Sequence, residues 1–226
     1  MPIYYGTQKV KPNGIKEAYY GSQKIYSAAR LPSAYQEVEY IQSLDQSEGT
    51  TYFETNIKYN SSNKYVFELE IKALPTTIEY TSFGWDGGGQ INVSKVVMDD
   101  GMQTIEVNIL EKTKFIQTIE AGTSTNSIIT VINSSEAKTL TRKHQNLSSY
   151  AMTNGYGIFV RFSYGNIGMI RAFQLYSFKC SINGVLTNEL VPCYRKSDNE
   201  VGLFDIVENT FYTNQGNGTF IKGNDI

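Results

Sequence analysis

The chain has 226 residues and a formal net charge of -2, because 22 Asp and Glu slightly outnumber 20 Lys and Arg. This near balance gives no overall field that would favour nucleic acid or an anionic membrane, and no apolar run of about 18 residues is present to cross a bilayer. One histidine and two cysteines are too few for a typical zinc site or a disulfide scaffold. No secretory signal peptide is visible. Cys180 and Cys193 are 13 residues apart and could pair, but we expect two free, buried thiols.

The first thirty residues contain an internal repeat, in which YYGTQKV at residues 4–10 returns as YYGSQKI at residues 19–25. Each copy predicts two short β segments around a Gly-Thr or Gly-Ser turn. Because isolated hairpins are only marginally stable, they need each other, the rest of the chain or a partner to pack against. We interpret residues 1–30 as an attachment segment; the alternative is an ordered extension of the following domain. In the first interpretation the contacts come from Tyr4, Tyr5, Tyr19 and Tyr20.

Beyond a joint at Leu31 and Pro32, the pattern predicts an all-β domain over residues 31–226. The 17 Tyr, 11 Phe and 19 Gly suit twisted sheets and tight turns. Strict alternation is clearest at residues 65–74, where every second residue is apolar. Residues 138–148 are the one segment left open to a helical turn. Weaker alternation predicts further strands at residues 37–42, 52–57, 90–98, 104–110, 115–119, 128–132, 157–163 and 170–182.

Both ends of the larger part resemble a known family. LPSAYQEVEYIQS at residues 31–43, TTYFETNI at residues 50–57 and LVPCYRKSDNEVGLFDIVENTFYTNQGNGTFIKG at residues 190–223 resemble the concanavalin-like, laminin G-like jelly rolls of bacteriophage structural proteins and prophage regions. The YYG repeat is similar to units that precede such domains in phage tail and head appendage proteins. The resemblance implies a two-sheet jelly-roll sandwich with a short N-terminal β-hairpin extension, carried on the virion surface.

Residues 190–223 are interpreted as a segment that specifies the fold and not a ligand site. We expect Pro192 to end a strand and Asp205 to accept backbone N–H groups in the turn that follows it. Asn214, with the glycines at positions 216 and 218, predicts a turn that returns Phe220 to the core.

Catalytic groups are sparse. Glu68 and Glu70 share a strand face about 7 Å apart, a spacing that a glycosidase could use, but Lys72 stands where a third acidic residue of the jelly-roll glucanase pattern would fall. Glu37 and Glu39 have the same spacing, and they too lack further acidic residues of a glucanase pattern nearby. His144 lies in a polar run without a Ser or Cys elbow. We therefore expect no enzymatic activity.

The glycine-rich segment at residues 83–90 is the most suggestive binding feature, since an aromatic ring beside amide and carboxylate groups suits a sugar. The alternative is that the single tryptophan is a core anchor. Loops near residues 154–157 and 164–166 offer further aromatic and amide groups that suit either sugar or protein contacts. The candidate carbohydrate-binding residues are Trp85, Asp86, Gln90, Tyr156, Tyr164 and Asn166.

No cofactor is expected. Laminin G-like domains often bind calcium, and Asp99 and Asp100 carry the matching carboxylates, but calcium needs six to eight oxygens and a hairpin turn suits this pair better. The leading hypothesis is a non-enzymatic phage appendage or decoration protein, with other virion proteins and host-surface polysaccharide as partners. A purely structural virion protein and a glycan-cleaving enzyme are the alternatives, and a homo-oligomer stays open because no heptad run indicates a trimeric stalk.

Overall fold

The computed structural model divides the chain into two compact units, residues 1–33 and 34–226. It describes residues 3–5, 8–10, 17–20, 23–27, 31–43, 50–60, 62–74, 81–82, 90–91, 95–98, 103–106, 110–120, 124–133, 137–145, 155–163, 166–170 and 173–226.

The first unit contains two hairpins, one for each copy of the repeat. β1 (Ile3–Tyr5) pairs with β2 (Gln8–Val10), and β3 (Glu17–Tyr20) pairs with β4 (Gln23–Ser27). Tyr5 faces Gln8 and Tyr20 faces Gln23, so the strands of each copy are joined across the same Gly-Thr or Gly-Ser position. The predicted N-terminal β-hairpin extension is therefore confirmed.

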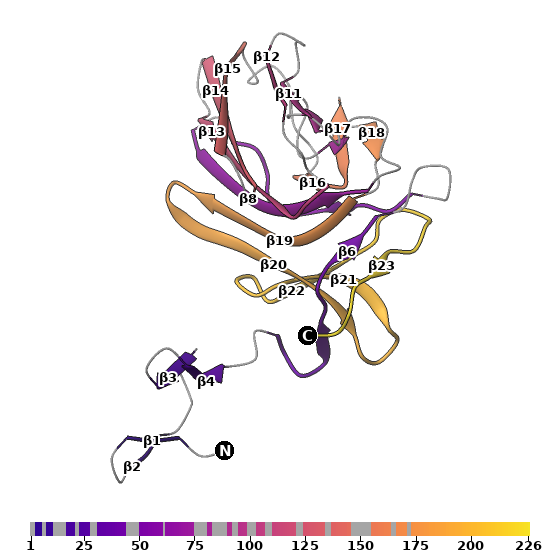
Figure 1. The fold of residues 1–226 in the computed structure, drawn as a ribbon. Helices are drawn as coiled ribbons and strands as arrows, with labels where there is room; N and C mark the ends of the chain where they lie inside the picture. The colour runs from indigo at the N-terminus through magenta and orange to yellow at the C-terminus, as the bar shows by residue number, and fades with distance from the viewer. Residues whose placement is uncertain are drawn as a thin grey trace. The chain divides into compact units, whose positions relative to one another are not determined.

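The second unit is a two-sheet, all-β sandwich of the jelly-roll type, as predicted (Figure 1). Its large sheet runs in the order β15-β14-β13-β8-β19-β20-β21-β22, with β5 beside β20 and β6 between β19 and β23. The strands of this sheet are β5 (Tyr35–Glu37), β6 (Ile41–Gln42), β8 (Lys64–Ala73), β13 (Thr113–Glu120), β14 (Ser124–Ile132), β15 (Ala137–Gln145), β19 (Phe173–Ile182), β20 (Val185–Arg195), β21 (Glu200–Asp205), β22 (Thr210–Thr213) and β23 (Ile221–Lys222).

A second layer lies on the concave side of the curved large sheet, where Figure 1 shows β11, β12, β16, β17 and β18. In this layer β16 pairs with β7, β17 with β18, and β9 to β12 form a four-stranded sheet. Its strands are β7 (Phe53–Glu54), β9 (Thr81–Ser82), β10 (Gln90–Ile91), β11 (Lys95–Met98), β12 (Gln103–Glu106), β16 (Gly157–Ile158), β17 (Val160–Ser163) and β18 (Asn166–Ile170).

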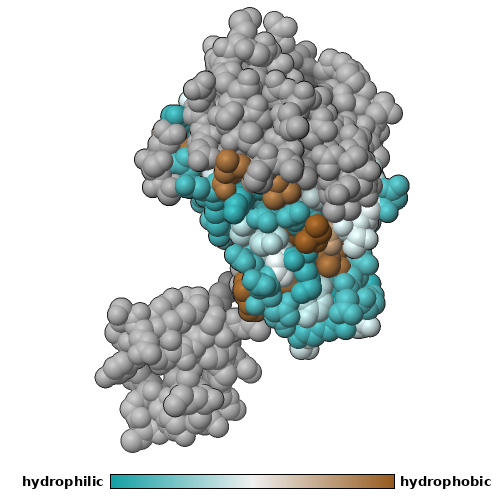
Figure 2. Space-filling view, turned by 45° about the vertical axis from the view of Figure 1, so that its right-hand side comes forward, coloured by the Kyte–Doolittle hydropathy of each residue, from teal (hydrophilic) through white to brown (hydrophobic). Residues whose placement is uncertain are grey.

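The core forms because alternate residues of the long strands face the second layer. In β8, Tyr65, Phe67 and Ile71 are completely buried, while the intervening side chains are half-buried on the outer face. Aromatic rings fill the space between the layers, with Phe67 stacked on Tyr156 at 4.0 Å between centroids. The described surface turned toward the viewer in Figure 2 is mainly hydrophilic, with small separate hydrophobic areas.

The two ends of the second unit are fastened to each other. The Asn214 Oδ1 accepts from the backbone N–H groups of Tyr52 and Gly216, and its Nδ2 donates to the Gly218 carbonyl. The turn carries Phe220 into the core, where its ring stacks on Phe53 at 4.4 Å. The predicted role of Asn214 is confirmed. A side chain at Gly216 would collide with the Thr50 carbonyl, so this position requires glycine.

One prediction about a strand end is wrong, and one segment left open by the sequence is a strand. Pro192 does not end a strand but lies inside β20, where it faces Leu203 of β21. One edge of β20 pairs first with β19 and then with β5, and Pro192 lies where this partner changes. The Pro192 carbonyl accepts a hydrogen bond from the Val38 N–H on that edge. Because the missing N–H of proline falls on the same edge, no ladder hydrogen bond to β21 is lost. Of residues 138–148, which the sequence leaves open to a helical turn, residues 138–145 belong to β15, a strand paired along its length with β14, and residues 146–148 lie outside the described residues.

Both cysteines are free and completely buried, as expected. Burial raises the pKa of the Cys180 and Cys193 thiols to about 12.

We predict that neither thiol of the folded chain reacts with a disulfide reagent at a pH of about 8, because the thiolate is the nucleophile. Both should react once the chain is unfolded in guanidinium chloride, and rapid reaction of the folded chain would contradict this placement. Folding raises the pKa of both thiols, so the two protonated thiols contribute fully to the free energy of unfolding below the pKa of the unfolded chain. This contribution declines as pH rises toward 12.

We predict that Phe220→Ala lowers the free energy of unfolding by about 3–5 kcal/mol, because it removes a buried ring and leaves a cavity beside Phe53. Urea unfolding monitored by circular dichroism measures the change. Val207→Ala is the control, since Val207 is 44% exposed, and it should change stability by less than about 0.5 kcal/mol. A loss below about 1 kcal/mol for Phe220→Ala would mean that the closing turn does not complete the core.

Candidate functional site

The predicted sugar-contact residues are only partly within the described structure. Trp85, Asp86 and Tyr164 lie outside the described residues, as do Asp99 and Asp100. Gln90 begins β10 opposite Ser82 and Val97, and Asn166 begins β18 opposite Ser163. For these two residues the strand position is described and the side chain is not.

The predicted attachment tyrosines occupy matching places in the two hairpins. Tyr4 and Tyr5 lie in β1, and Tyr19 and Tyr20 lie in β3. Tyr4 faces Lys9, and Tyr19 faces Lys24. The two copies therefore share the pairing of their tyrosines, while a register shift between Ala18 and Tyr19 sets the rest of the second hairpin apart. Attachment through these residues stays a prediction.

Tyr156 is a core residue, and its prediction as a sugar contact is wrong. Its side chain is 1% exposed and its ring stacks on Phe67. The hydroxyl donates to Gln117 Oε1 at 3.4 Å. Desolvation raises the pKa of this phenol far above its ordinary value. A ring enclosed in this way has no face left for a ligand.

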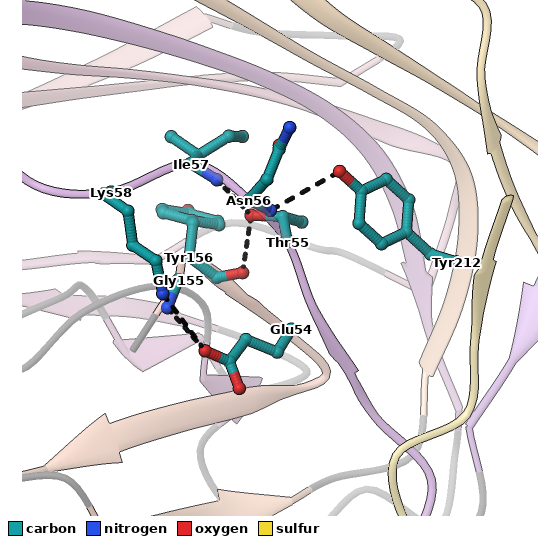
Figure 3. A network of polar contacts seen from close by, with 8 residues as sticks. All are labelled: Glu54, Thr55, Asn56, Ile57, Lys58, Gly155, Tyr156 and Tyr212. Atoms are coloured by element: carbon teal, nitrogen blue, oxygen red, sulfur yellow. Dashed lines mark hydrogen bonds and ion pairs between the residues drawn. The ribbon is translucent and has the colours of Figure 1, made fainter. Parts of the chain in front are cut away.

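The backbone on either side of Tyr156 belongs to a polar network that joins it to the segment after β7 (Figure 3). The Thr55 hydroxyl donates to the Tyr156 carbonyl at 3.0 Å, and the Tyr156 N–H donates to the Ile57 carbonyl at 2.9 Å. Beside them the Gly155 N–H donates to Glu54 Oε1 at 2.8 Å. These groups bond to one another, so the network fastens two segments of the chain together.

A second buried network surrounds Asp205 and continues to the first. Its Oδ1 accepts from the backbone N–H groups of Glu189, Val207 and Glu208, at 3.0 to 3.3 Å. Its Oδ2 accepts from Asn188 Nδ2 at 2.7 Å, and the same nitrogen donates to Asn56. The prediction that Asp205 accepts N–H groups of the following turn is confirmed. The carboxylate is completely buried and has a structural role.

The paired carboxylates on β8 lie on the outer face of the sheet. Glu68 is ion-paired with Lys114 at 2.6 Å, and Glu70 with Lys112 at 2.9 Å. Both glutamates are 36% exposed, so solvent screens these pairs. Across the described ranges, no group of three or more His, Cys, Asp or Glu is arranged to hold a metal ion. Nor does the described part of the chain contain a helix that is long and apolar enough to cross a membrane.

One cluster on the outer face was not singled out by the sequence. We call it the Tyr-Gln array, and it consists of Tyr40, Gln42, Gln174 and Tyr176. Gln42 of β6 faces Gln174 of β19, and Gln174 Nε2 donates to Gln42 Oε1 at 3.1 Å. The Tyr176 hydroxyl donates to Gln174 Oε1 at 2.9 Å. Alternation with the buried Ile41 and Leu175 indicates that Gln42 and Gln174 point outward. Nothing in the sequence shows that these two residues, 132 positions apart, lie on neighbouring strands.

Comparison with known proteins gives no match to a family model, to a characterised protein or to a solved structure. The class of this protein is given by its architecture, which is a jelly-roll sandwich preceded by two β-hairpins.

We predict that Asp205→Asn lowers the free energy of unfolding by about 1–3 kcal/mol. An amide retains one acceptor oxygen and places an NH₂ group among buried donors, so at least one N–H loses its partner. Chemical unfolding measures the loss. Glu208→Gln in the same turn is the matched control, because that side chain is exposed, and it should leave the midpoint unchanged. Equal effects of the two substitutions would contradict the structural role of Asp205.

Proposed function

We propose that the chain is a non-enzymatic bacteriophage appendage or decoration protein, in which residues 1–30 attach to other virion proteins and the sandwich contacts host-surface polysaccharide. The protein would then lie on the virion surface. This proposal combines the resemblance of residues 31–43, 50–57 and 190–223 to phage laminin G-like domains with the organisation of the chain.

The observation that carries the proposal is the separate unit made by the repeat. Two hairpins with equivalent tyrosine pairings precede a sandwich that has its own core. An attachment role explains why a chain would carry the same Tyr-Tyr-Gly hairpin twice, since repeated weak contacts on a common partner add to one stronger attachment.

The absence of enzymatic activity is supported by the placement of the carboxylates considered for catalysis. Glu68 and Glu70 each have a lysine partner on an open, half-exposed strand face. A glycosidase needs a carboxylic acid and a carboxylate on either side of a scissile bond. A strand face lined with ion pairs fits a solvated surface better than such a pair.

Host adsorption tests the proposal directly. Particles that carry the full chain should adsorb to host cells and bind isolated host envelope polysaccharide, whereas particles lacking residues 31–226 should do neither at the same level. Tyr→Ala substitution at positions 4, 5, 19 and 20 should reduce the amount of the chain that copurifies with particles, because it removes the proposed contact side chains.

Three outcomes separate the alternatives. Unchanged adsorption combined with fragile particles after removal of residues 31–226 would favour a purely structural virion protein. Release of reducing ends from the polysaccharide, abolished by Glu68→Gln or Glu70→Gln, would favour a glycan-cleaving enzyme. Binding without cleavage, unaffected by these two substitutions, is the result that the proposal predicts.

A further inference from the structure

We propose that the Tyr-Gln array is a carbohydrate-binding surface that takes uncharged pyranose units of a polysaccharide. This inference rests on the proposed function, since it names the surface through which the sandwich would contact polysaccharide.

The array presents amide groups in a fixed orientation. The Tyr176 hydroxyl donates to Gln174, and Gln174 donates to Gln42, so the hydrogen bonds run in one direction across β19 and β6. Burial, Glu39 and Tyr40 raise the pKa of Tyr176, whose hydroxyl is the donor in the bond to Gln174. The chain of donors ends at Gln42, whose Nε2 donors have no partner among the described residues. Amide donors and acceptors held in this way match sugar hydroxyl groups, which both donate and accept.

Tyr176 lies at a β-bulge of β19. Leu175 faces Ile71 of β8 and Ser177 faces Glu70, so Tyr176 is the extra residue between two paired positions. Bulges re-aim a side chain and are over-represented near functional sites. Tyr176 and Ser177, on either side of this shift, are both half-buried, and the Tyr176 hydroxyl bonds to the amide of Gln174.

The two tyrosine rings are held by their surroundings. Tyr40 lies against Gly223, where an added Cβ would be 2.8 Å from the ring. The Tyr40 and Tyr176 rings lie 5.5 Å apart at 56°, which gives an angled aromatic surface. The C–H groups of a pyranose can pack against such a surface while its hydroxyls reach the amides. Little side-chain freedom is left to lose on binding, which favours affinity.

The charges around the array favour an uncharged ligand. Lys112 Nζ lies 4.8 Å from the centre of the Tyr176 ring and is ion-paired with Glu70 at 2.9 Å. Lys72 faces Gln174, and exposed Glu39 lies near Tyr176. Because cations and carboxylates are both present, the surface has no excess of either sign that would select a polyanion such as nucleic acid.

Affinity electrophoresis of the full chain tests the inference, with gels that contain dextran, galactomannan, xylan, soluble starch or hydroxyethyl cellulose. At least one polysaccharide should retard the wild-type chain. Gln42→Ala and Gln174→Ala should each weaken this binding about tenfold, since each removes amide hydrogen bonds to the sugar. Both side chains are half-buried on the surface, and circular dichroism checks that the variants are folded.

Two controls give the result its meaning. Thr139→Ala changes an exposed residue elsewhere on the same sheet and should leave binding unchanged. Trp85→Ala tests the alternative loop. If Trp85→Ala abolishes retardation while the two glutamine variants bind as well as wild type, the array is not the site and the proposed function stands. If no polysaccharide, including isolated host envelope polysaccharide, retards the wild-type chain, both the array and the proposed carbohydrate-binding function are wrong.

Discussion

The side-chain amide of Asn214 joins two segments that lie 162 residues apart, at a point where no strand ladder connects them. Its oxygen accepts from Tyr52 and Gly216, and its nitrogen donates to Gly218. The turn that it stabilises brings Phe220 against Phe53 and closes the core at the ends of the second unit. Backbone hydrogen bonds from Gln215 to Tyr52 and from Gly218 to Thr50 support the same closure, and β23 pairs with β6 beyond it.

Polar groups in this fold divide into two sets with different roles. The buried set around Asp205, Asn188, Thr55 and the Tyr156 backbone is bonded internally and joins segments that are distant in sequence. Such groups are retained because an unpaired buried donor or acceptor would be costly. The outer face of the large sheet carries the other set, which combines ion pairs with half-exposed tyrosines and glutamines. Of these two sets, the second is the one exposed to a partner, which is why the Tyr-Gln array is the more informative of the surfaces within the described residues.

Much of the fold follows from short-range patterns in the sequence, and much of the candidate site does not. The alternation in β8 predicts its buried face, and the turn residues Asp205 and Asn214 act as their chemistry indicates. Tyr156 was misassigned because its glycine-flanked segment looks like an exposed loop, whereas the chain there pairs with residues 54–57. Proline usually indicates a strand end, but Pro192 lies within β20 because the neighbour of this strand changes there from β19 to β5. That change depends on how the sheet is assembled and leaves no local pattern in the sequence. The array joins Gln42 to Gln174 only through strand register, which no local pattern contains.

Native-state hydrogen exchange tests most directly whether the closure at Asn214 is part of the same cooperative unit as the large sheet. The informative amides are those of Tyr52, Gly216 and Gly218, compared with the central strand β8. If closure and sheet are one unit, these amides exchange only through global opening, with the same free energy as the buried part of β8. Exchange at the two ends that is faster by orders of magnitude, with β8 still protected, would show that the sandwich holds together without the closure.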